Sequence, residues 1–397
     1  ASHLPAFVRS LIEQNYSVVC VRAKAWRAVA FDDWLARRDV ELIDVGDELI
    51  DLFHRRSYLR RSDCRSEPHR HESTDLRHLL RYLRAHDLCA PAPKRSWPAD
   101  AIVDAFERFL IRDRGLAAST VRGYCATARG FLVDRFGDQG VDLAVIDASD
   151  VQRLVGRHAR RLRPRALKQV VSALRAFIRY GEYCGDVGSL LIGAIPAVAV
   201  WTTTPQLPRA ISPEHAQRAI ASCDRGGPVG CRDRAILLML ARLGLRSGEV
   251  LELMLDDVDW DAGHIRVRGK NGHACLMPLP ADVGQAITAY LEHGRPATLD
   301  RHLFVRTRAP FTGLRHDSDG VGSIVRNALR RAGVDAPHRG SHQFRHALAV
   351  RMLKEGASIP EIGELLRHRS PVATSVYARV DLVALRALAL PWPGSVA

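Results

Sequence analysis

The stretch from Gly340 to Tyr377 constrains the fold of this chain more than any other part of the sequence. His342 and Arg345 are three residues apart, so on a helix they project from one face. Apolar residues at helical spacing form a packing stripe on the opposite side, and Gly356 can end the helix. We therefore predict a helix that packs on one side and presents polar groups on the other.

A second short element returns the chain toward this helix. Pro360 can open it, and Ser370-Pro371 breaks the chain after His368. Tyr377 then lies on a separate element that can be turned back toward the polar face of the first helix. Two histidines, an arginine and a tyrosine that converge without a carboxylate suit a phosphodiester. Positive donors stabilise the charge that develops on the phosphate while a phenol attacks phosphorus.

These residues resemble a family signature. His-x-x-Arg-His, then Leu-Leu-x-His, then a tyrosine nine positions later is similar to the C-terminal signature of the tyrosine recombinases, the phage integrase family. Upstream, Leu243 to Glu249 resembles the family's first arginine motif, which follows a buried helix and contains Arg246. Between the two, Gly269 to Gly272 fits the β-hairpin that carries the family's lysine, here Lys270. The three motifs stand in the family's order.

The resemblance implies a role for each catalytic residue. Arg246 and Arg345 would clamp the scissile phosphate, because a guanidinium is permanently charged and its planar fork can pair with two nonbridging oxygens. His342 and His368 would hydrogen-bond that phosphate and move protons to or from Tyr377. The tyrosine would form a 3′-phosphotyrosyl link, and the hairpin lysine would protonate the departing 5′-oxygen. The implied catalytic set is Arg246, Lys270, His342, Arg345, His368 and Tyr377.

No cofactor is expected. The resemblance implies that the covalent intermediate stores the bond energy, so neither ATP nor metal is required. His342 and His346 form an i, i+4 pair, but the glutamate of a His-Glu-x-x-His zinc site is absent and no third ligand is evident. Arg367 stands where the family usually has glycine, which either alters the local backbone or adds a phosphate contact. Glu249 and Asp257 fit acids that buttress the site.

The charge of the whole chain favours a polyanionic partner. Lysine and arginine number 58 against 44 acids, which gives a net charge of +14 and a pI near 9.9. No uninterrupted apolar run reaches the ~18 residues of a membrane-spanning helix. The N-terminus lacks the features of a signal peptide, and the eight scattered cysteines include no Cys-x-x-Cys pair. We expect reduced thiols and a bacterial cytoplasmic, nucleoid-associated protein with no membrane partner.

Prolines divide the chain into domains. Pro91, Pro93 and Pro98 mark one break, and the segment 195–212 is rich in proline and threonine without an amphipathic period. Ser212-Pro213-Glu214 then supplies an N-cap, a first-position proline and an acid in the first turn of a new helix. We predict a helical extension over 1–95, a core-binding helical domain over 96–195, a linker over 196–212, a catalytic domain over 213–380 and a docking tail over 381–397.

The predicted fold class is mainly α. Helical N-terminal DNA-binding domains would precede a mostly helical catalytic domain with a small antiparallel β-sheet. Cys231 to Leu243 is apolar enough to be a buried helix, and the alternation on either side of Asn271-Gly272 indicates a hairpin. Further helices are predicted at about 281–293 and 320–332.

The extension contains a faint echo of the domain that follows it. Val21 recurs as Val121 and Phe31 as Phe131, about 100 residues later. Either one small helical module is duplicated, or amphipathic helices merely look alike. The basic, histidine-rich segment 54–71 matches no zinc spacing, so we interpret it as a solvated or phosphate-facing run. The extension is either an arm-site or additional DNA-binding domain, or a protein-interaction module.

The densest basic stretch lies in the predicted core-binding domain. It has almost no acidic partners in the sequence, so contact with nucleic acid is favoured over a merely charged helix surface. The resemblance implies that this domain grips the far side of the duplex. The stretch contains Arg153, Arg157, Arg160, Arg161, Arg163, Arg165 and Lys168.

The sequence as a whole indicates a site-specific tyrosine recombinase or integrase. It would cut and rejoin double-stranded DNA through a Holliday junction during integration, excision or transposition of a mobile element. The apolar segment after Tyr377 would dock on its own domain or exchange between protomers of a homo-tetramer on two DNA sites. An accessory protein that bends DNA or sets direction is a further expected partner. Two alternatives remain: a type IB topoisomerase that relaxes DNA, and a non-catalytic DNA-binding protein on the same fold.

Overall fold

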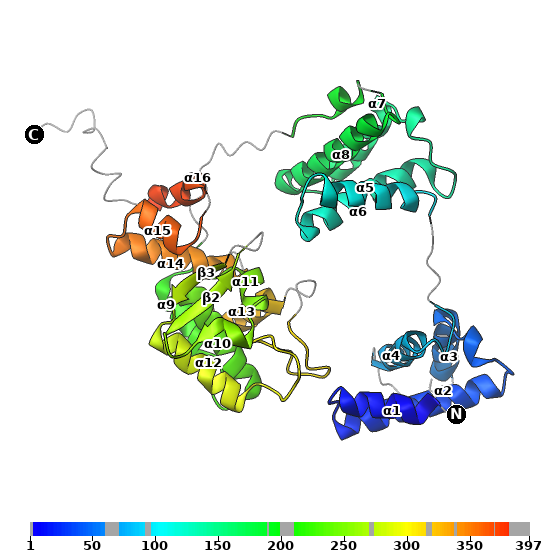
Figure 1. The fold of residues 1–397 in the computed structure, drawn as a ribbon, viewed down its shortest axis with the longest axis horizontal. Coiled ribbons are helices and arrows are strands. Elements are labelled where there is room, and N and C mark those ends of the chain that lie inside the picture. The colour runs from blue at the N-terminus through cyan, green and yellow to red at the C-terminus, as the bar shows by residue number, and fades with distance from the viewer. Residues whose placement is uncertain are drawn as a thin grey trace, which may run out of the picture. The chain divides into compact units, whose positions relative to one another are not determined.

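The chain is mainly α-helical and has one small antiparallel sheet (Figure 1), which confirms the predicted fold class. The computed structural model describes residues 3–59, 71–91, 97–188, 190–198, 210–269, 274–314, 320–336, 340–368 and 370–380. By its internal contacts the chain divides into a unit over 93–205 and a unit that holds the remainder. The five segments named from the sequence stay a prediction.

The described residues of the N-terminal part, drawn in blue in Figure 1, form four helices and a 3-10 turn. Phe7, Phe31, Ile50 and Leu76, one from each helix, belong to a single buried core. The Ser17 side chain caps the second helix by accepting a hydrogen bond from a backbone N–H in its first turn. The elements are α1 (His3–Glu13), α2 (Val18–Ala36), η1 (Leu42–Asp44), α3 (Asp47–Leu59) and α4 (His71–Ala85).

The middle part has its own buried core, which includes Phe106, Phe131, Leu154 and Phe177. Asp147 starts the third helix of this part with a reciprocal capping box. The elements are α5 (Asp100–Arg112), α6 (Ala118–Phe136), η2 (Leu143–Val145), α7 (Ala148–Ala159), α8 (Pro164–Cys184) and η3 (Leu191–Ala194).

The N-terminal and middle parts repeat one layout. Helices α2 and α6 are both 19 residues long and begin 100 positions apart, and a three-residue 3-10 turn follows each of them. Before each of these helices stands a residue of positive φ, Asn15 at 60° and Gly115 at 56°. Phe31 and Phe131, which stand at the same place in these two helices, both belong to the buried core of their own part. The echo in the sequence therefore reflects a repeated helical module rather than a chance likeness of amphipathic helices.

The last part of the chain is built around α10 (Pro228–Arg242), which contacts α9, α12, α13 and α14. Its stretch from Ala235 to Leu240 is apolar and buried, as the sequence predicts for this segment, although Arg232 and Asp233 before it are charged and buried as well. The helices predicted at 281–293 and 320–332 are α12 and α13. The remaining elements are α9 (Pro213–Ala221), α11 (Ser247–Leu251), η4 (Leu255–Asp257), α12 (Ala281–His293), α13 (Gly320–Arg331), α14 (His342–Lys354), α15 (Ile359–Leu365), α16 (Pro371–Thr374) and η5 (Ser375–Val380).

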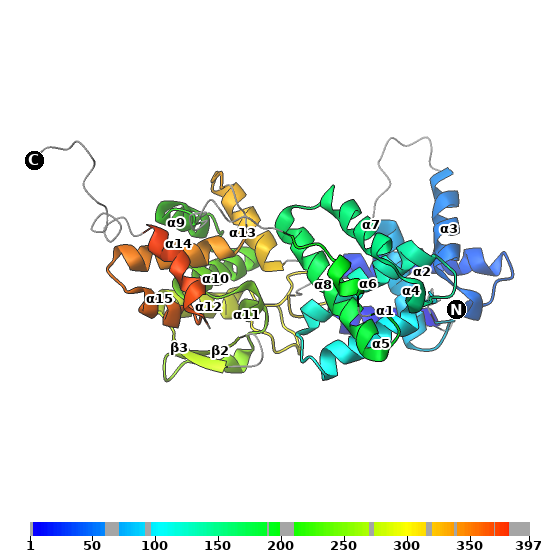
Figure 2. The ribbon, with the colours of Figure 1, turned by 90° about the horizontal axis from the view of Figure 1, so that it is seen from above.

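The sheet is a meander of β1 (Val258–Asp259), β2 (His264–Arg268) and β3 (Ala274–Pro278). β2 and β3 pair antiparallel, with Val267 opposite Cys275. The sheet faces the viewer in Figure 1 and lies at the lower edge of the same body in Figure 2. The predicted hairpin is present, but its tip and Lys270 lie outside the described residues.

None of the helices formed by the described residues combines the length and apolarity needed to cross a membrane. Over the same residues, no three His, Cys, Asp or Glu side chains are grouped so that they could hold a metal ion.

Candidate active site

Segments that lie far apart in the sequence converge on one polar cluster. Arg246 is the N-cap of α11, and His342 and Arg345 stand in the first turn of α14. His368 follows α15, and Tyr377 lies in η5. Because α14 contacts both α15 and η5, these predicted residues share one region of the last part of the chain.

Arg345 is anchored by backbone carbonyls. The residue is 3% exposed, and its two Nη atoms donate hydrogen bonds to the carbonyl oxygens of Gly244 and Leu366. These bonds tie α14 to the chain before α11 and to the end of α15. Burial, and then the charges of Arg246 and Arg367, lower the pKa of Arg345 to about 9. The guanidinium therefore stays cationic at neutral pH.

Gly244 makes this close approach possible. Its φ is +58°, in the left-handed region that favours glycine. A Cβ at this position would lie 2.7 Å from Cδ2 of Leu366 and 3.0 Å from Cδ2 of Leu348. The glycine that precedes Arg246 by two residues thus lets the helices around Arg345 pack together.

Arg246 is held by Glu249, one helical turn later. Its Nη1 donates to Oε1 at 2.7 Å, and its backbone N–H donates to Oε2 at 2.8 Å. The Glu249 side chain is 4% exposed and that of Arg246 is 37% exposed, so a buried carboxylate supports a guanidinium that solvent can still reach. Burial alone would raise the pKa of Glu249, but hydrogen bonds from Arg246 and the charge of Arg367 hold that pKa below its usual value.

Arg367 adds a third arginine to the cluster. Its φ of +52° is in the region that favours glycine, the residue usual in the family at this place. Its Nη2 donates to Oε2 of Glu249 at 2.8 Å, and its Nη1 lies 2.6 Å from the sulfur of Met277. The backbone thus keeps a conformation typical of glycine, while the side chain turns to the carboxylate that also holds Arg246.

Tyr377 is enclosed by the histidines. It is 1% exposed, and its hydroxyl lies 2.9 Å from Nδ1 of His346. Its ring is parallel to that of His368, with an interplanar angle of 4° and centroids 6.5 Å apart. Burial raises the pKa of Tyr377, and the charge of Arg345 offsets only part of this effect. The phenol is therefore protonated at neutral pH.

The two predicted histidines are uncharged at neutral pH. Burial, followed by the charges of Arg345 and Arg246, lowers the pKa of His368 to about 4. The same causes lower the pKa of His342. Nδ1 of His368 lies 2.7 Å from Oγ1 of Thr374, which fixes the orientation of the ring.

His346 is the residue that sequence reasoning missed. From the sequence it is the last residue of the His-x-x-Arg-His motif and half of a rejected zinc pair, without a predicted catalytic role. In the structure it contacts the Tyr377 hydroxyl, and its ring lies 6.2 Å from that of His342 on the same face of α14. The available signal was its place directly after Arg345, one helical turn from His342.

The basic stretch of the middle part has more acidic partners than the sequence suggested. Arg153 bonds to Asp150 at 3.0 Å, and Arg157 forms an ion pair with Asp134. The expectation that the stretch lacks such partners is therefore wrong for these two arginines. Asp150 lies three residues before Arg153 in α7, whereas Asp134 reaches Arg157 from the neighbouring helix α6. For the other five cations, the described residues include no ion-pair partner. They are Arg160, Arg161, Arg163, Arg165 and Lys168.

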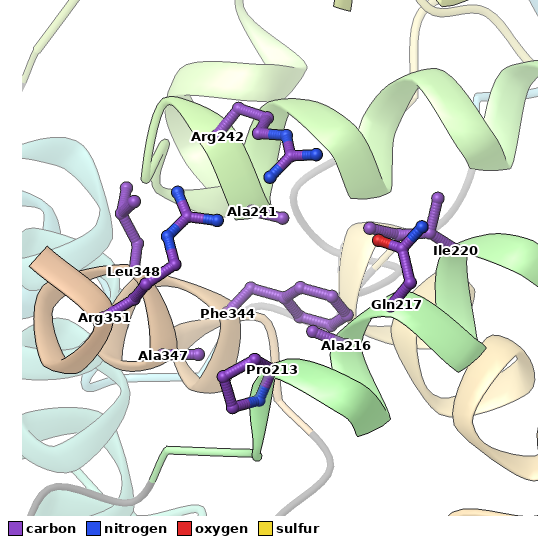
Figure 3. Close-up of a pocket in the computed structure, with 10 residues that line it drawn as sticks. All are labelled: Pro213, Ala216, Gln217, Ile220, Ala241, Arg242, Phe344, Ala347, Leu348 and Arg351. Carbon is purple, nitrogen blue, oxygen red and sulfur yellow. The ribbon is translucent and has the colours of Figure 1, made fainter. Parts of the chain in front are cut away.

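A groove lies between α9, α10 and α14 (Figure 3). Its floor is apolar and includes Ala216, Phe344 and Ala347, whereas Arg242 and Arg351 stand at its rim. A depression of this kind suits an apolar segment of chain.

Comparison with known proteins identifies the family to which this chain is similar. Residues 209–382 match the phage integrase family, and residues 103–182 match the phage integrase N-terminal SAM-like domain. The putative integrase/recombinase y4rA of Sinorhizobium fredii is 45% identical over 99% of this chain and 95% of its own length. The tyrosine recombinase XerD of Mycobacterium tuberculosis is 30% identical over 72% of this chain and 94% of its own length.

Solved structures share the fold. XerH site-specific recombinase bound to difH DNA has a TM-score of 0.56 at 17% identity and covers 89% of this chain and 98% of its own. The Tn1549 transposon integrase in complex with circular intermediate DNA has a TM-score of 0.51 at 18% identity. The match covers 71% of this chain and 99% of the integrase chain. The chain therefore belongs to the phage integrase family of tyrosine recombinases, which carry out site-specific DNA recombination.

Proposed function

We propose that this chain cleaves and rejoins double-stranded DNA through a 3′-phosphotyrosyl intermediate and a Holliday junction, in the integration, excision or transposition of a mobile element. The observation that carries the proposal is the enclosed Tyr377 hydroxyl, which lies beside histidines and close to the charge of Arg345. The solved relatives XerH and the Tn1549 integrase, both described in complex with DNA, support a duplex as the substrate.

In the proposed cleavage step Arg246 and Arg345 bind the nonbridging oxygens of the scissile phosphate. They stabilise the negative charge that grows as phosphorus becomes five-coordinate. The Tyr377 oxygen forms a bond to phosphorus while the bond from phosphorus to the 5′-oxygen breaks. Lys270 gives the departing 5′-oxygen its proton. Joining is the reverse reaction, in which the 5′-hydroxyl of another strand attacks and tyrosine leaves, so neither ATP nor metal takes part.

The phenol proton needs an acceptor, and His346 is the nearest base to it at 2.9 Å. The lowered pKa values of His342 and His368 leave both rings neutral, so each would act as a hydrogen-bond donor to the phosphate rather than as a cation. Because Tyr377 is buried in the free protein, DNA binding has to open a path from its hydroxyl to the phosphate.

DNA binding is assigned to the core-binding domain over 96–195, joined by the linker 196–212 to the catalytic domain over 213–380. The cations from the end of α7 into the start of α8 for which the described residues include no ion-pair partner are the ones we expect at the phosphate backbone. Arg163 is the N-cap of α8 and Arg165 stands in its first turn, so the positive end of this helix dipole would also lie near the duplex.

For assembly we propose a homo-tetramer on two DNA sites. The tail 381–397 is rich in leucine and follows the last described helix directly. The groove between α9, α10 and α14 has the apolar floor that such a tail requires (Figure 3). Deleting residues 381–397 should leave binding to a single site intact and remove the complex that holds two sites, as seen by native gel electrophoresis.

Strand exchange tests the proposal. The protein's preferred duplex is first selected from a random-sequence DNA library by binding, and then a labelled and an unlabelled copy are incubated with protein in EDTA without ATP. Recombinant strands and four-way junctions are expected. Relaxation of supercoiled plasmid without exchange would assign the chain to topoisomerase-like chemistry. Binding without any strand cleavage would leave a DNA-binding protein on the same fold.

A further inference from the structure

The outer face of α2 carries large apolar side chains that are exposed. Val19, Trp26 and Val29 are 78%, 65% and 45% exposed. Phe31 and Leu35 of the same helix are buried in the core of the N-terminal part. A helix that is apolar on both sides is typically covered on both sides. The second face of α2 therefore requires a partner.

Six of the exposed residues of α2 follow a heptad. Their spacing alternates between three and four, and each of them is exposed. This spacing produces a straight seam along which a second helix packs. Two charged residues of opposite sign, Arg22 and Asp33, stand at equal distances from the middle of the seam, one near each end. The seam residues are Val19, Arg22, Trp26, Val29, Asp33 and Ala36.

We propose that α2 pairs with α2 of a second copy of this chain, in antiparallel orientation. A two-fold axis midway between Trp26 and Val29 would place Trp26 against the partner's Val29. The same axis would place Arg22 against the partner's Asp33. A parallel pair would instead bring each arginine to the other arginine and each aspartate to the other aspartate, which like-charge repulsion opposes.

Both charges of the seam are available for such a pair. Within the residues that the structure describes, neither the Arg22 guanidinium nor the Asp33 carboxylate takes part in an ion pair. Other cations of the same part are used internally, since Lys24 and Arg27 both contact Asp75. The contact between two identical faces closes on itself and gives a dimer rather than a filament.

The repeated module provides an internal comparison. Helix α6 has the same length as α2, yet Ser119 and Ala126 stand 100 positions after Val19 and Trp26. Arg129 matches Val29 and is bound to Asp100 of its own module at 2.7 Å. The apolar seam is therefore a property of the N-terminal copy alone. Of the two roles considered for the extension over 1–95, this apolar seam favours protein interaction over arm-site DNA binding.

Sedimentation velocity of the full chain without DNA tests the proposal. The wild-type protein should dimerise as its concentration rises. Arg22→Glu and Asp33→Lys should each weaken dimerisation at least ~10-fold, because each reversal places like charges across the seam twice. The double variant should recover most of the wild-type affinity, since both reversals together restore opposite charges. Arg122→Glu, at the matching position of α6, is the control and should dimerise normally.

Several results would overturn the proposal. These are a wild-type protein that stays monomeric at every concentration, single variants that dimerise like wild type, or a double variant as weak as the singles. Circular dichroism of each variant checks that it is folded. These exposed positions should tolerate the substitutions. Tyr377→Phe should dimerise like wild type, so a failure of the proposed chemistry and a failure of the seam are separate results.

Discussion

Glu249 lies between Arg246 and Arg367, and its buried carboxylate is what lets two guanidinium groups share one cluster. A third cation, Arg345, is held instead by the carbonyls of Gly244 and Leu366. At the scale of single residues, the positive charge of the site is thus fixed before any phosphate arrives. Such fixed dipoles and charges need little rearrangement during the reaction, which is the physical source of their catalytic effect.

Replacing Arg367 tests whether the third arginine contributes to that effect. Arg367→Gly should relieve the left-handed backbone but slow covalent cleavage about 10-fold, because Glu249 loses one of its two cations. Arg367→Lys should fall between glycine and wild type, since it keeps the charge without the planar fork. Single-turnover rates on a nicked duplex measure both. A glycine variant as fast as wild type would show that Arg367 is structural only.

His78 gives the free energy of unfolding a dependence on pH. Burial, and then the charges of Lys24 and Arg81, lower the pKa of His78 to about 4. The unfolded chain, with a histidine pKa of about 6.5, therefore binds more protons between these values. Stability is complete above about pH 6.5 and falls as the pH drops toward 4. His368 contributes in the same direction.

Chemical denaturation at pH 7.5 and pH 4.5 measures this loss. His78→Gln should lose less stability between the two pH values than wild type, whereas the exposed His293→Gln should lose as much as wild type. An unchanged loss in His78→Gln would place the responsible groups elsewhere.

At the scale of elements, the sequence predicted the helices that carry the site but not their mutual contacts. The spacing of His342, Arg345 and Tyr377, read with helix-breaking prolines, was enough to place each on its element. The bond from the Tyr377 hydroxyl to His346 depends on how η5 packs against α14, which no local pattern encodes. The ion pair of Arg157 with Asp134 likewise joins two helices and is invisible within either one.

Gly244 is the point at which these elements depend on one another. Gly244→Ala should destabilise the protein by about 2 kcal/mol or more, because a Cβ there meets Leu366 and Leu348 on a left-handed backbone. Gly284→Ala in α12 is the matched control, since its Cβ would be in ordinary contact at 3.6 Å. Gly284→Ala should increase the free energy of unfolding by about 0.5–1 kcal/mol. Chemical denaturation compares the two, and equal effects would contradict the packing argument.

At the scale of the whole molecule, a repeated helical module precedes the catalytic part, and the two copies differ on their surfaces. The middle copy has cations from the end of α7 into α8 for which the described part of the chain shows no ion-pair partner, whereas the N-terminal copy carries an apolar seam on α2. The repeat is faint in the sequence because matching core positions need buried apolar side chains but not identical residues. The exposed residues of the two copies differ more than the buried ones, and the different uses that we propose for them rest on this difference.

Salt dependence of DNA binding tests the use of the middle copy. Arg160→Gln with Arg161→Gln should reduce the slope of log K against log salt by about 2, one unit for each phosphate contact. Arg153→Gln with Arg157→Gln removes the same charge from side chains that already bond to Asp150 and Asp134. This control should change the slope less. Equal slopes for the two double variants would contradict the assignment.

The covalent link itself tests the central claim most directly. The protein is incubated in EDTA with a nicked duplex that carries its selected site, so that the released strand diffuses away and the intermediate accumulates. Peptide mass spectrometry then locates the attached nucleotide. We predict a 3′-phosphoryl bond to Tyr377 and no covalent product from Tyr377→Phe. A link to any other residue, or a product that persists in the phenylalanine variant, would contradict the account.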